Sequence, residues 1–466
     1  MELLYPLLNH QVAAVEKVRG LKVGALYMEQ GTGKTRTTLD LIKTRLDKGK
    51  IDKVIWLCPC SVRQNLREDI LYHCGEEPPA IMIRGIESLS SSDRLYLELL
   101  NIAKKHKVML VVDESNLVKN PFAKRTMRIK TIAEKCKYKM ILNGTPVSRN
   151  EADLFAQWYM LDWRILGYQS YYSFAANHIE YKTVKLPDGR EIKTDQIARI
   201  HNPEYLTQKI SPYTYQIKKA DCLDLPDKVY DCQWAYPTSE QSDHYEEIKY
   251  KYLEGVSEFR SETVYKLFTA LQHVSSGRYV TTGPDERMQT EPMFTWDNNP
   301  RIMALKELLE DLGDEQAIIY AKYKSEIEEI ESLLASMGKT YTEFTGRIKQ
   351  RQRQENRKKF QSGIQFMIAN KVCGCYGLNL QFCHNIIFYS NDFDYATRSQ
   401  AEDRVHRLGQ KEVVHIYDIC MAHTIDSFIA DNLQRKEDMV KALKQQIDIW
   451  KNEKITKKNL KTPARS

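Results

Sequence analysis

The sequence lacks any run of about 18 uncharged apolar residues, the length that a helix needs to cross a bilayer. Its opening segment, residues 1–6, has no basic stretch ahead of its apolar residues, so it lacks the pattern of a secretory signal peptide. We therefore expect a protein without a membrane anchor that works in the cytoplasm.

The ten cysteines include no pair at the two-residue spacing common in structural zinc sites. The closest pairs, Cys58/Cys60 and Cys373/Cys375, are separated by a single residue. Cys58 and Cys383 adjoin apolar runs, so buried free thiols in a reducing compartment are favoured over disulfides or a metal site. The sequence also contains no zinc finger or other base-reading module, so sequence-specific recognition of nucleic acid has no visible carrier.

The chain has 466 residues, which is too long for one ordinary hydrophobic core and suits two or three domains. Hydrophobic residues make up 42% and charged residues 28%, the balance of a soluble globular protein. The net charge of +7 suits a polyanionic partner, but a mild excess of lysine also serves solubility. The net charge alone therefore does not decide whether the protein binds a polyanion such as nucleic acid.

Short apolar runs alternate with helical patterns through the first 165 residues. Val23–Met28 predicts a buried strand, a glycine loop follows it, and a helix is expected from Thr35 towards Leu46. Near-continuous apolar strands between helices indicate a parallel sheet that is covered on both faces. The other strands expected here are Val54–Leu57, Ala80–Ile83, Val108–Val112 and Met140–Leu142.

The same alternation returns late in the chain, after a middle part that is rich in aromatic residues. In that part we expect a hairpin turn at 185–190, a helical stretch over 240–271 and a linker over 281–299. The fold class predicted is therefore α/β, with two parallel-sheet lobes and a mainly helical segment between them. The strands expected in the second lobe are Ala317–Tyr320, Phe366–Ala369, Asn385–Tyr389 and Val414–Tyr417.

Four domains follow from this pattern. The first lobe is expected at 1–165, a helical and irregular insertion with the linker at 166–300, and the second lobe at 301–450. The tail at 451–466 is rich in lysine and has no periodicity, so it is expected to be disordered.

The strongest single pattern is Gly31-Thr32-Gly33-Lys34-Thr35, which lies between a predicted strand and a predicted helix. The glycines allow backbone N–H groups to approach phosphate oxygens, and the N-terminus of the helix adds positive charge. Lys34 is expected to reach the β- and γ-phosphates of ATP, and the Thr35 hydroxyl to coordinate Mg²⁺.

Two adjacent carboxylates, Asp113 and Glu114, follow the predicted strand Val108–Val112. At the C-terminal end of a strand such a pair suits Mg²⁺ binding by Asp113 and polarisation of water by Glu114. By itself the segment is more typical of a helix N-cap, because Asp and Ser favour such positions. The presence of the phosphate loop decides in favour of the catalytic interpretation.

A third segment, Gln400–Gln410, contains Arg404 and Arg407, which we expect to share one face of a helix. From a second lobe, two such arginines can neutralise the charge that develops on the γ-phosphate during its transfer. An arginine-rich helix is more often a solvated surface, so the spacing alone does not decide their role.

Taken together, these segments resemble the ordered motifs of helicase superfamily two, and in particular its Swi/Snf branch. DESNLVKN at 113–120 is similar to the family's Asp-Glu-Ala-His box and the Lys-Asn after it, and NGTPV at 143–147 is similar to its Thr-Gly-Thr-Pro motif. The string HRLGQ at 406–410 is close to diagnostic of the branch. Further similar segments are His10–Gln11, Glu29–Thr35, Leu225–Ile248 and Gly377–Leu380, so the resemblance covers roughly residues 1–445.

The resemblance implies two RecA-like lobes and an ATP-dependent motor, a monomer, that travels along intact double-stranded DNA. It implies that Gln11 reads adenine, that Gln400 also binds the nucleotide, and that Arg404 and Arg407 act in catalysis. The compact chain without appended domains favours a bacterial or phage source.

Met28 stands where the strict phosphate-loop pattern has glycine, and the family's loop likewise lacks that glycine. The sequence departs from the family at three places. Cys373–Tyr376 replaces an Ala-Gly-Gly run. Asn116 replaces a histidine and Asn143 replaces a threonine, at positions that link hydrolysis to movement in the family.

Three other functions compete with the duplex translocase. A strand-separating DNA or RNA helicase needs a wedge, for which the sequence shows no obvious candidate. A small-molecule P-loop kinase would explain Lys34 but neither the Gly144–Pro146 segment nor Arg404 and Arg407. A nucleic-acid scaffold with an inactive nucleotide site conflicts with the intact Lys34, Asp113 and Glu114.

The basic stretch 347–359 suits phosphate contacts or a solvated helix face. Binding of nucleic acid is therefore expected to be directed at its backbone and sensitive to salt.

Overall fold

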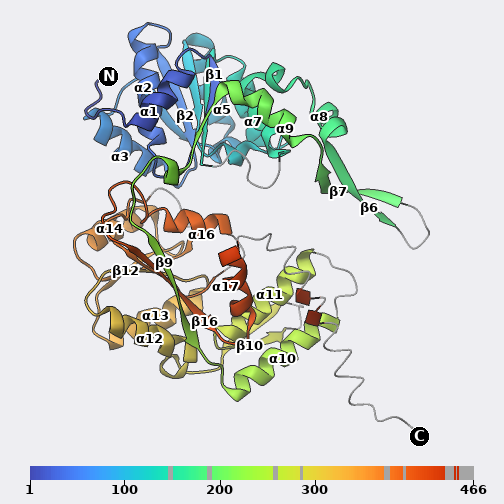
Figure 1. Cartoon of the computed structure of the whole chain (residues 1–466), viewed down its shortest axis with the longest axis vertical. Coiled ribbons are helices and arrows are strands. Elements are labelled where there is room, and N and C mark those ends of the chain that lie inside the picture. Colours follow the sequence, from blue (N-terminus) through green and yellow to red (C-terminus); the bar gives the residue numbers. More distant parts are fainter. Residues whose placement is uncertain are drawn as a thin grey trace. The chain divides into compact units, whose positions relative to one another are not determined.

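The computed structural model describes residues 1–144, 151–185, 191–254, 261–283, 287–371, 378–391, 395–435, 446–447 and 449–450. The chain divides into two compact units, unit 1 at 1–225 and unit 2 at 226–466 (Figure 1). Among the described helices, none combines the length and the apolar character that a membrane crossing requires.

Unit 1 is built on a six-stranded sheet with the strand order β3-β2-β4-β5-β1-β8, in which every pair of neighbours is parallel. The five strands expected from apolar runs are confirmed, whereas β8 was not expected. The strands are β1 Val23–Met28, β2 Lys53–Cys58, β3 Ile81–Gly85, β4 Val108–Val112, β5 Tyr138–Asn143 and β8 Thr214–Ile217.

Both faces of this sheet are buried, because neighbouring residues of a strand enter different cores. Tyr27 packs in a core with residues of helices α5, α6 and α7, whereas Leu26 and Met28 pack in a core with residues of α1, α2 and α3. The prediction of a sheet covered on both sides is therefore confirmed. The helices of unit 1 are α1 Asn9–Val18, α2 Lys34–Asp47, α3 Arg63–Cys74, α4 Ser88–Ser91, α5 Asp93–Lys105, α6 Lys124–Ala133, α7 Asp153–Leu166, α8 Tyr171–His178 and α9 Pro203–Ile210, with the 3₁₀ helices η1 Ser115–Val118, η2 Ser211–Tyr213 and η3 Lys219–Asp221.

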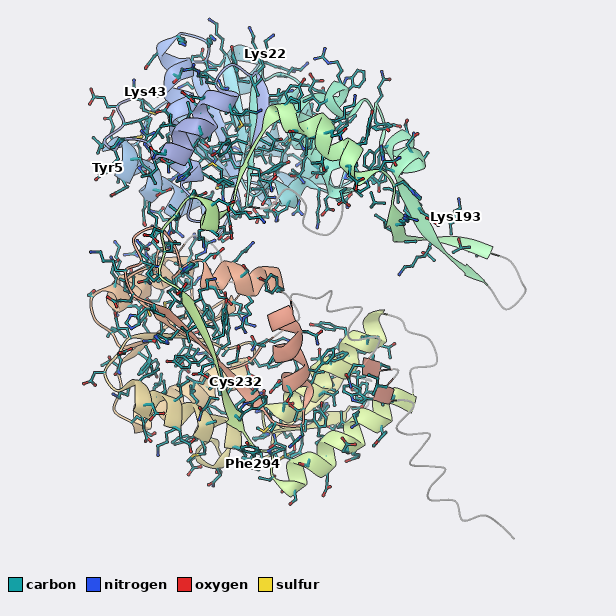
Figure 2. All side chains as sticks on the ribbon, in the orientation of Figure 1. Tyr5, Lys22, Lys43, Lys193, Cys232 and Phe294 are labelled. Atoms are coloured by element: carbon teal, nitrogen blue, oxygen red, sulfur yellow. The ribbon has the colours of Figure 1, made fainter. Side chains whose placement is uncertain are left out.

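An antiparallel hairpin, β6 Ile179–Lys185 with β7 Glu191–Ile200, extends away from the body of unit 1 (Figure 1). Its base is anchored, since Tyr181, Ile197 and Ile200 pack against the core. Further out, the side chains of Ile192 and Lys193 are exposed, and Lys193 is labelled in Figure 2. The turn expected at 185–190 lies between the two strands, and residues 186–190 are outside the described part of the chain.

Unit 2 contains a second six-stranded parallel sheet, with the order β13-β14-β12-β15-β16-β9. All four strands expected in this region are confirmed, and the two that were not expected, β9 and β13, lie at its edges. The prediction of two parallel α/β lobes is thus confirmed. The strands are β9 Lys228–Ala235, β12 Ala317–Tyr320, β13 Tyr341–Phe344, β14 Phe366–Ala369, β15 Asn385–Phe388 and β16 Val414–Met421.

Unit 2 also has two packed faces and a separate helical core. Ile319 and Ile318 enter different cores on the two sides of the sheet. A third core joins α10, α11 and α17 with the ribbon of β10 and β11. The remaining elements are α10 Ser239–Glu254, α11 Ser261–Ser275, β10 Arg278–Thr282, β11 Met288–Pro292, η4 Trp296–Asn298, α12 Pro300–Leu312, α13 Lys324–Ser336, α14 Gln350–Gln361, α16 Tyr395–Glu402 and α17 Ile425–Arg435.

The middle part of the sequence is shared between the two units. Residues 166–225, with α8, α9 and the projecting hairpin, belong to unit 1, and residues 226–300 belong to unit 2. The helical stretch expected over 240–271 corresponds to α10 and α11. The segment 281–299 contains the end of β10, the whole of β11 and η4.

Candidate functional site

The glycine loop lies between β1 and α2, as the sequence predicts. Gly31 and Gly33 have positive φ angles of 84° and 85°, a left-handed conformation that is costly for a residue with a Cβ atom. A Cβ atom at Gly33 would also overlap Gln11 Nε2. Both glycines are therefore required by the shape of the loop, which leaves its backbone open to a ligand.

Helix α1 holds this loop from one side. His10 Nε2 lies 2.8 Å from the carbonyl oxygen of Thr32, and Gln11 Nε2 donates to the same oxygen at 3.2 Å. Gln11 Oε1 accepts from the backbone N–H of Leu8 at 3.0 Å, so both ends of its amide are engaged. The structure thus places Gln11 against the phosphate loop, and its expected contact with adenine stays a prediction.

Lys34 and Thr35 form the first turn of α2. Lys34 Nζ donates to the backbone carbonyl of Met28 at 2.8 Å, which bends the lysine back over the loop. The side chain of Met28 is fully buried in the core beneath α1 to α3. The missing glycine at position 28 therefore has a physical reason, because the methionine side chain points into the core and the loop uses only its carbonyl group.

The carboxylates Asp113 and Glu114 follow the C-terminal end of β4. The Asp113 N–H donates to Leu57 O at 2.7 Å, and Asp113 Oδ1 accepts from the Glu114 N–H at 3.0 Å. Burial, together with the neighbouring charge of Glu114, raises the pKa of Asp113 to about 7, while the ammonium group of Lys34 acts in the opposite direction. The loop and the acidic pair are thus close enough to interact electrostatically.

Glu114 has a left-handed backbone, with φ at 48° and ψ at 56°. For a residue other than glycine this conformation costs on the order of 1–3 kcal/mol and is found most often at functional sites. It lies between β4 and η1. The strain is consistent with a carboxylate that is held in one required orientation.

The segment after Glu114 is supported by α7, which sequence reasoning did not connect with the site. The Ser115 hydroxyl donates to Gln157 Oε1 at 2.5 Å, and Gln157 Nε2 donates to the Asp153 carbonyl at 2.9 Å. Lys119 forms an ion pair with the Asp153 carboxylate at 3.4 Å. Gln157 and Asp153 belong to no recognisable motif, so only the fold reveals their role.

The donors assembled in unit 1 fit a nucleotide with a divalent cation. A positive-φ glycine loop at a helix N-terminus suits phosphate, and the hydroxyl of Thr35 with the carboxylate of Asp113 provides the hard oxygen donors that Mg²⁺ prefers. The Glu114 carboxylate and the Lys34 ammonium, which donates to the Met28 carbonyl, supply a base and a positive charge beside these donors. The structure brings together Gln11, the 31–35 loop, Asp113 and Glu114, all within unit 1.

The raised pKa of Asp113 leads to a stability prediction. In the unfolded chain its pKa is about 3.9, so the folded state holds the proton to a higher pH and loses stability as the pH rises from about 4 to about 7. Asp113→Asn should therefore stabilise the nucleotide-free protein at pH 8, by on the order of 1 kcal/mol or about 2–4 °C in Tm, and by little at pH 4.5. Thermal unfolding without Mg²⁺ measures this, with the exposed Glu16→Gln as the control. A variant no more stable than the natural protein at pH 8 would contradict the raised pKa.

In unit 2 the prediction of a helix through Arg404 and Arg407 is wrong. Helix α16 ends at Glu402, and residues 403–409 form consecutive turns. The helix does not continue because the Arg404 carbonyl accepts from the N–H of Leu380 at 3.0 Å, and Gly409, with a φ of 97°, lies at the end of the turns. Arg407 Nη1 donates to Asn379 Oδ1. Both arginines thus stand on a turn that is tied to the 378–380 segment.

A buried ionic network fixes the helix that leads into this turn. Arg398 Nη2 donates to Asp418 Oδ2 at 2.8 Å, and Arg398 Nε donates to Glu402 Oε1 at 3.1 Å. Lys228 Nζ and the Tyr230 hydroxyl, both on β9, donate to Glu402 Oε2 at 2.9 Å. Although burial acts in the opposite direction, Lys228 and Arg398 hold the pKa of Glu402 below its ordinary value. Arg398 is therefore a positioning residue that the motif pattern did not reveal.

Of the other predicted residues, some lie in the described part of the chain and some lie outside it. Gln400 lies half-buried on α16, one turn before the arginines. Of the segments that resemble family motifs, 145–147 and Gly377 lie outside the described residues, as do Cys373 and Cys375. The basic stretch 347–359 is mostly the exposed helix α14, where Arg351 pairs with Glu355.

Comparisons with known proteins match both units. Residues 14–281 match the SNF2-related domain, and residues 300–409 match the helicase conserved C-terminal domain. The TATA-binding protein-associated factor mot1 of Aspergillus fumigatus is 23% identical over 88% of this chain and 25% of its own length, so the chain spans a quarter of that relative. The uncharacterized ATP-dependent helicase YqhH of Bacillus subtilis is 22% identical over 95% of this chain and 80% of its own length. Among solved structures, the Sulfolobus solfataricus SWI2/SNF2 ATPase core in complex with dsDNA is 20% identical, with a TM-score of 0.40, over 94% of this chain and 93% of that chain.

Proposed function

Because the chain belongs to the SNF2-related family of helicase-like ATPases, we propose that it hydrolyses ATP and uses the free energy to move along double-stranded DNA. The observation that carries this proposal is that the phosphate loop with Lys34 follows β1 and the Asp113–Glu114 pair follows β4, with the charge of Lys34 acting on Asp113 at the C-terminal ends of these parallel strands. The proposal includes a monomer that acts in the cytoplasm of a bacterial or phage-infected cell.

Unit 1 supplies the groups that bind and cleave the nucleotide. The backbone N–H groups of the 31–34 loop and the Lys34 ammonium bind the phosphates, and Thr35 and Asp113 hold Mg²⁺, which neutralises phosphate charge when bound. Glu114 accepts a proton from the water that attacks the γ-phosphorus. The bond from that phosphorus to the bridging oxygen breaks, and ADP leaves with the electron pair.

Unit 2 supplies the arginines. Arg404 and Arg407 stabilise the negative charge that accumulates on the transferred phosphoryl group, and Gln400 binds the nucleotide from the same unit. The Arg398 network holds the end of α16, from which the turn that carries both arginines continues.

The choice of duplex DNA rests on the motif resemblance and on what phosphate binding requires. A motor that grips phosphates needs cationic side chains but no base contacts. Neither unit contains a base-reading module recognisable in the sequence, and the net charge of +7 favours a polyanion. Binding should therefore weaken strongly as the salt concentration rises.

The test compares nucleic acids in parallel. Duplex DNA is expected to stimulate ATP turnover several-fold more than single-stranded DNA or RNA, and the protein with ATP should displace the third strand of a triplex. Lys34→Ala, which removes the phosphate-binding ammonium, is the inactive control. Stimulation by RNA alone, or no displacement by an active ATPase, would rule out the duplex translocase.

Strand separation is a second candidate, and the projecting β6–β7 hairpin is the observation that favours it. A wedge has to stand away from the body of the motor, as this hairpin does (Figure 1). Thr183 and Lys193 are direct partners across the hairpin, so an Asn-Gly turn can join them and remove the part beyond. If the hairpin is a wedge, this shortened variant will lose the opening of a forked duplex and keep DNA-stimulated ATP turnover.

A further inference from the structure

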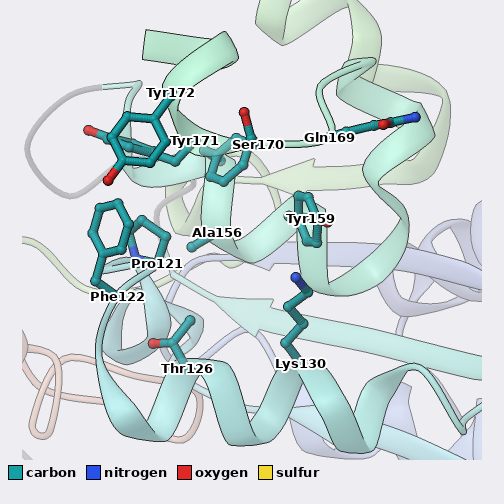
Figure 3. A pocket seen from close by; sticks show the side chains of 11 residues that line it. Pro121, Phe122, Thr126, Lys130, Ala156, Tyr159, Gln169, Ser170, Tyr171 and Tyr172 are labelled. Atoms are coloured by element: carbon teal, nitrogen blue, oxygen red, sulfur yellow. The ribbon is translucent and has the colours of Figure 1, made fainter.

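Unit 1 contains a cavity of about 260 Å³ that is separate from the phosphate loop. Its walls come from α6 and the residues just before it, from α7 and from the start of α8, and Phe122, Tyr171 and Tyr172 surround its opening (Figure 3). The Lys130 ammonium points towards Tyr159 within it and lies 4.1 Å from the centre of that ring (Figure 3). The cavity is smaller than the roughly 300–1,000 Å³ of sites for drug-sized ligands, and suits a single large side chain.

The rim of this cavity exposes large aromatic groups to water. Phe122 is 55% exposed and Tyr172 is 75% exposed, with ring centres 6.0 Å apart. Phe122 also meets Tyr171 edge-to-face at 5.4 Å, and Tyr171 packs in turn against Phe155 of the cavity wall. Aromatic rings that border a cavity, pack against its wall on one side and are exposed to water on the other are typical of a surface that binds an apolar side chain.

The surroundings of the cavity are cationic. Helix α6 carries four basic residues and no acidic one. Arg128 is neutralised by Asp93, but Lys130 has no carboxylate within ion-pair distance among the described residues. A ligand that fills the cavity therefore places its neighbouring groups next to positive charge, which favours carboxylates.

We propose that this cavity, between α6, α7 and α8, binds an acidic peptide segment of a partner protein through one aromatic or large aliphatic side chain. The anchor enters the cavity beside the Phe122 and Tyr172 rings, and a neighbouring carboxylate pairs with Lys130. The tail of this chain at 451–466 is a poor occupant, because it has five lysines, one acidic residue and no aromatic residue.

The position of the cavity connects it with the nucleotide site. Phe122 follows the Lys119–Asn120 end of the acidic motif, and the Asn120 side chain accepts from the Phe122 N–H at 2.9 Å. Helix α7 contributes Phe155 and Tyr159 to the cavity, and the same helix supports the motif through Gln157 and Asp153. Occupation of the cavity should therefore alter ATP turnover. That effect rests on the proposed ATPase, whereas peptide binding does not.

Binding can be tested with the whole protein and a fluorescein-labelled hexapeptide, Asp-Glu-Asp-Glu-Phe-Gly. Saturable binding below about 1 mM is expected by fluorescence anisotropy, with at least tenfold weaker binding to Phe122→Ala and to Lys130→Glu. Tyr265→Ala and Lys17→Glu, which change exposed residues on other helices, are the matched controls and should bind normally. Peptides with Ala for Phe, or with Lys for every acid, should bind at least tenfold more weakly.

Several results would overturn the proposal. Absence of saturable binding, equal binding to the cavity variants, or equal binding of the lysine peptide would each exclude an acidic peptide site. Loss of the labelled peptide to an unlabelled thymidine oligonucleotide, with the oligonucleotide binding weakened in Phe122→Ala, would identify a nucleobase site instead. Unchanged turnover at saturating peptide, in an active ATPase, would remove the regulatory effect. A protein without ATPase activity that still binds the peptide would contradict only the proposed motor function.

Discussion

Glu114→Gln is expected to slow ATP turnover by about 10²–10⁴-fold, the range that a general base contributes, while the affinity for ATP stays within a few-fold. The amide keeps the size of the side chain and removes the proton acceptor, and Lys34, Thr35 and Asp113 still bind the phosphates and the cation. Steady-state turnover with saturating duplex DNA and titration of a fluorescent ATP analogue measure the two quantities.

The comparison with Lys34→Ala makes this result specific. That variant should lose both hydrolysis and most nucleotide affinity, because the lysine contacts phosphate in the ground state as well. If Glu114→Gln loses affinity to the same extent, Glu114 is a binding residue and the roles of the two carboxylates have to be exchanged. Glutamate and glutamine have the same backbone requirement at position 114. The left-handed backbone there therefore does not explain a difference in turnover between the natural protein and Glu114→Gln.

Arg404→Ala and Arg407→Ala should each lower turnover by roughly 10³–10⁵-fold, the effect of arginine fingers in other nucleotide hydrolases. Both side chains are half-buried rather than part of a hydrophobic core, so their truncation should lower the melting temperature much less than truncation of the buried Arg398. Turnover at saturating ATP and DNA, with thermal unfolding of the same samples, provides the measurement.

Arg398→Ala is the matched structural control, six residues before Arg404. Removing Arg398 leaves Asp418 and Glu402 buried with fewer partners, which should destabilise unit 2 by about 3–5 kcal/mol. Lost turnover together with lost stability is therefore expected there. If Arg404→Ala and Arg407→Ala turn over normally, the 403–409 turn has no part in catalysis.

The sequence predicted the strands that are buried on both faces, because a continuous apolar run is their direct signature. It did not predict the edge strands β8, β9 and β13, which mix polar with apolar residues, although it did predict β3, an edge strand that begins with an apolar run. Where an edge strand lacks an apolar run, its pairing depends on residues far away in the chain rather than on its own pattern.

In the candidate site, too, local sequence patterns predicted some features, while features that depend on distant residues were missed. The 31–35 loop and Asp113–Glu114 were predicted, because adjacent residues of special type carry that chemistry. The helix expected through Arg404 and Arg407 was wrong, since a three-residue spacing cannot reveal the contact with Leu380 that ends it. Gln157 and Arg398 were missed because each acts through partners that are distant in sequence.

The pairing of β9 with β16 has a consequence for synthesis of the protein on the ribosome. Unit 1 has all of its sheet once β8 ends at Ile217, but β9 pairs with residues made about 190 positions later. At typical elongation rates of about 5–20 residues per second, β9 waits roughly 10–40 s without its neighbour. During that time Tyr230 and Trp234 lie on an unpaired strand, which is a surface that chaperones hold and that aggregates when left uncovered. Unit 2 is therefore the part of this chain whose yield should depend on translation speed and on chaperone supply.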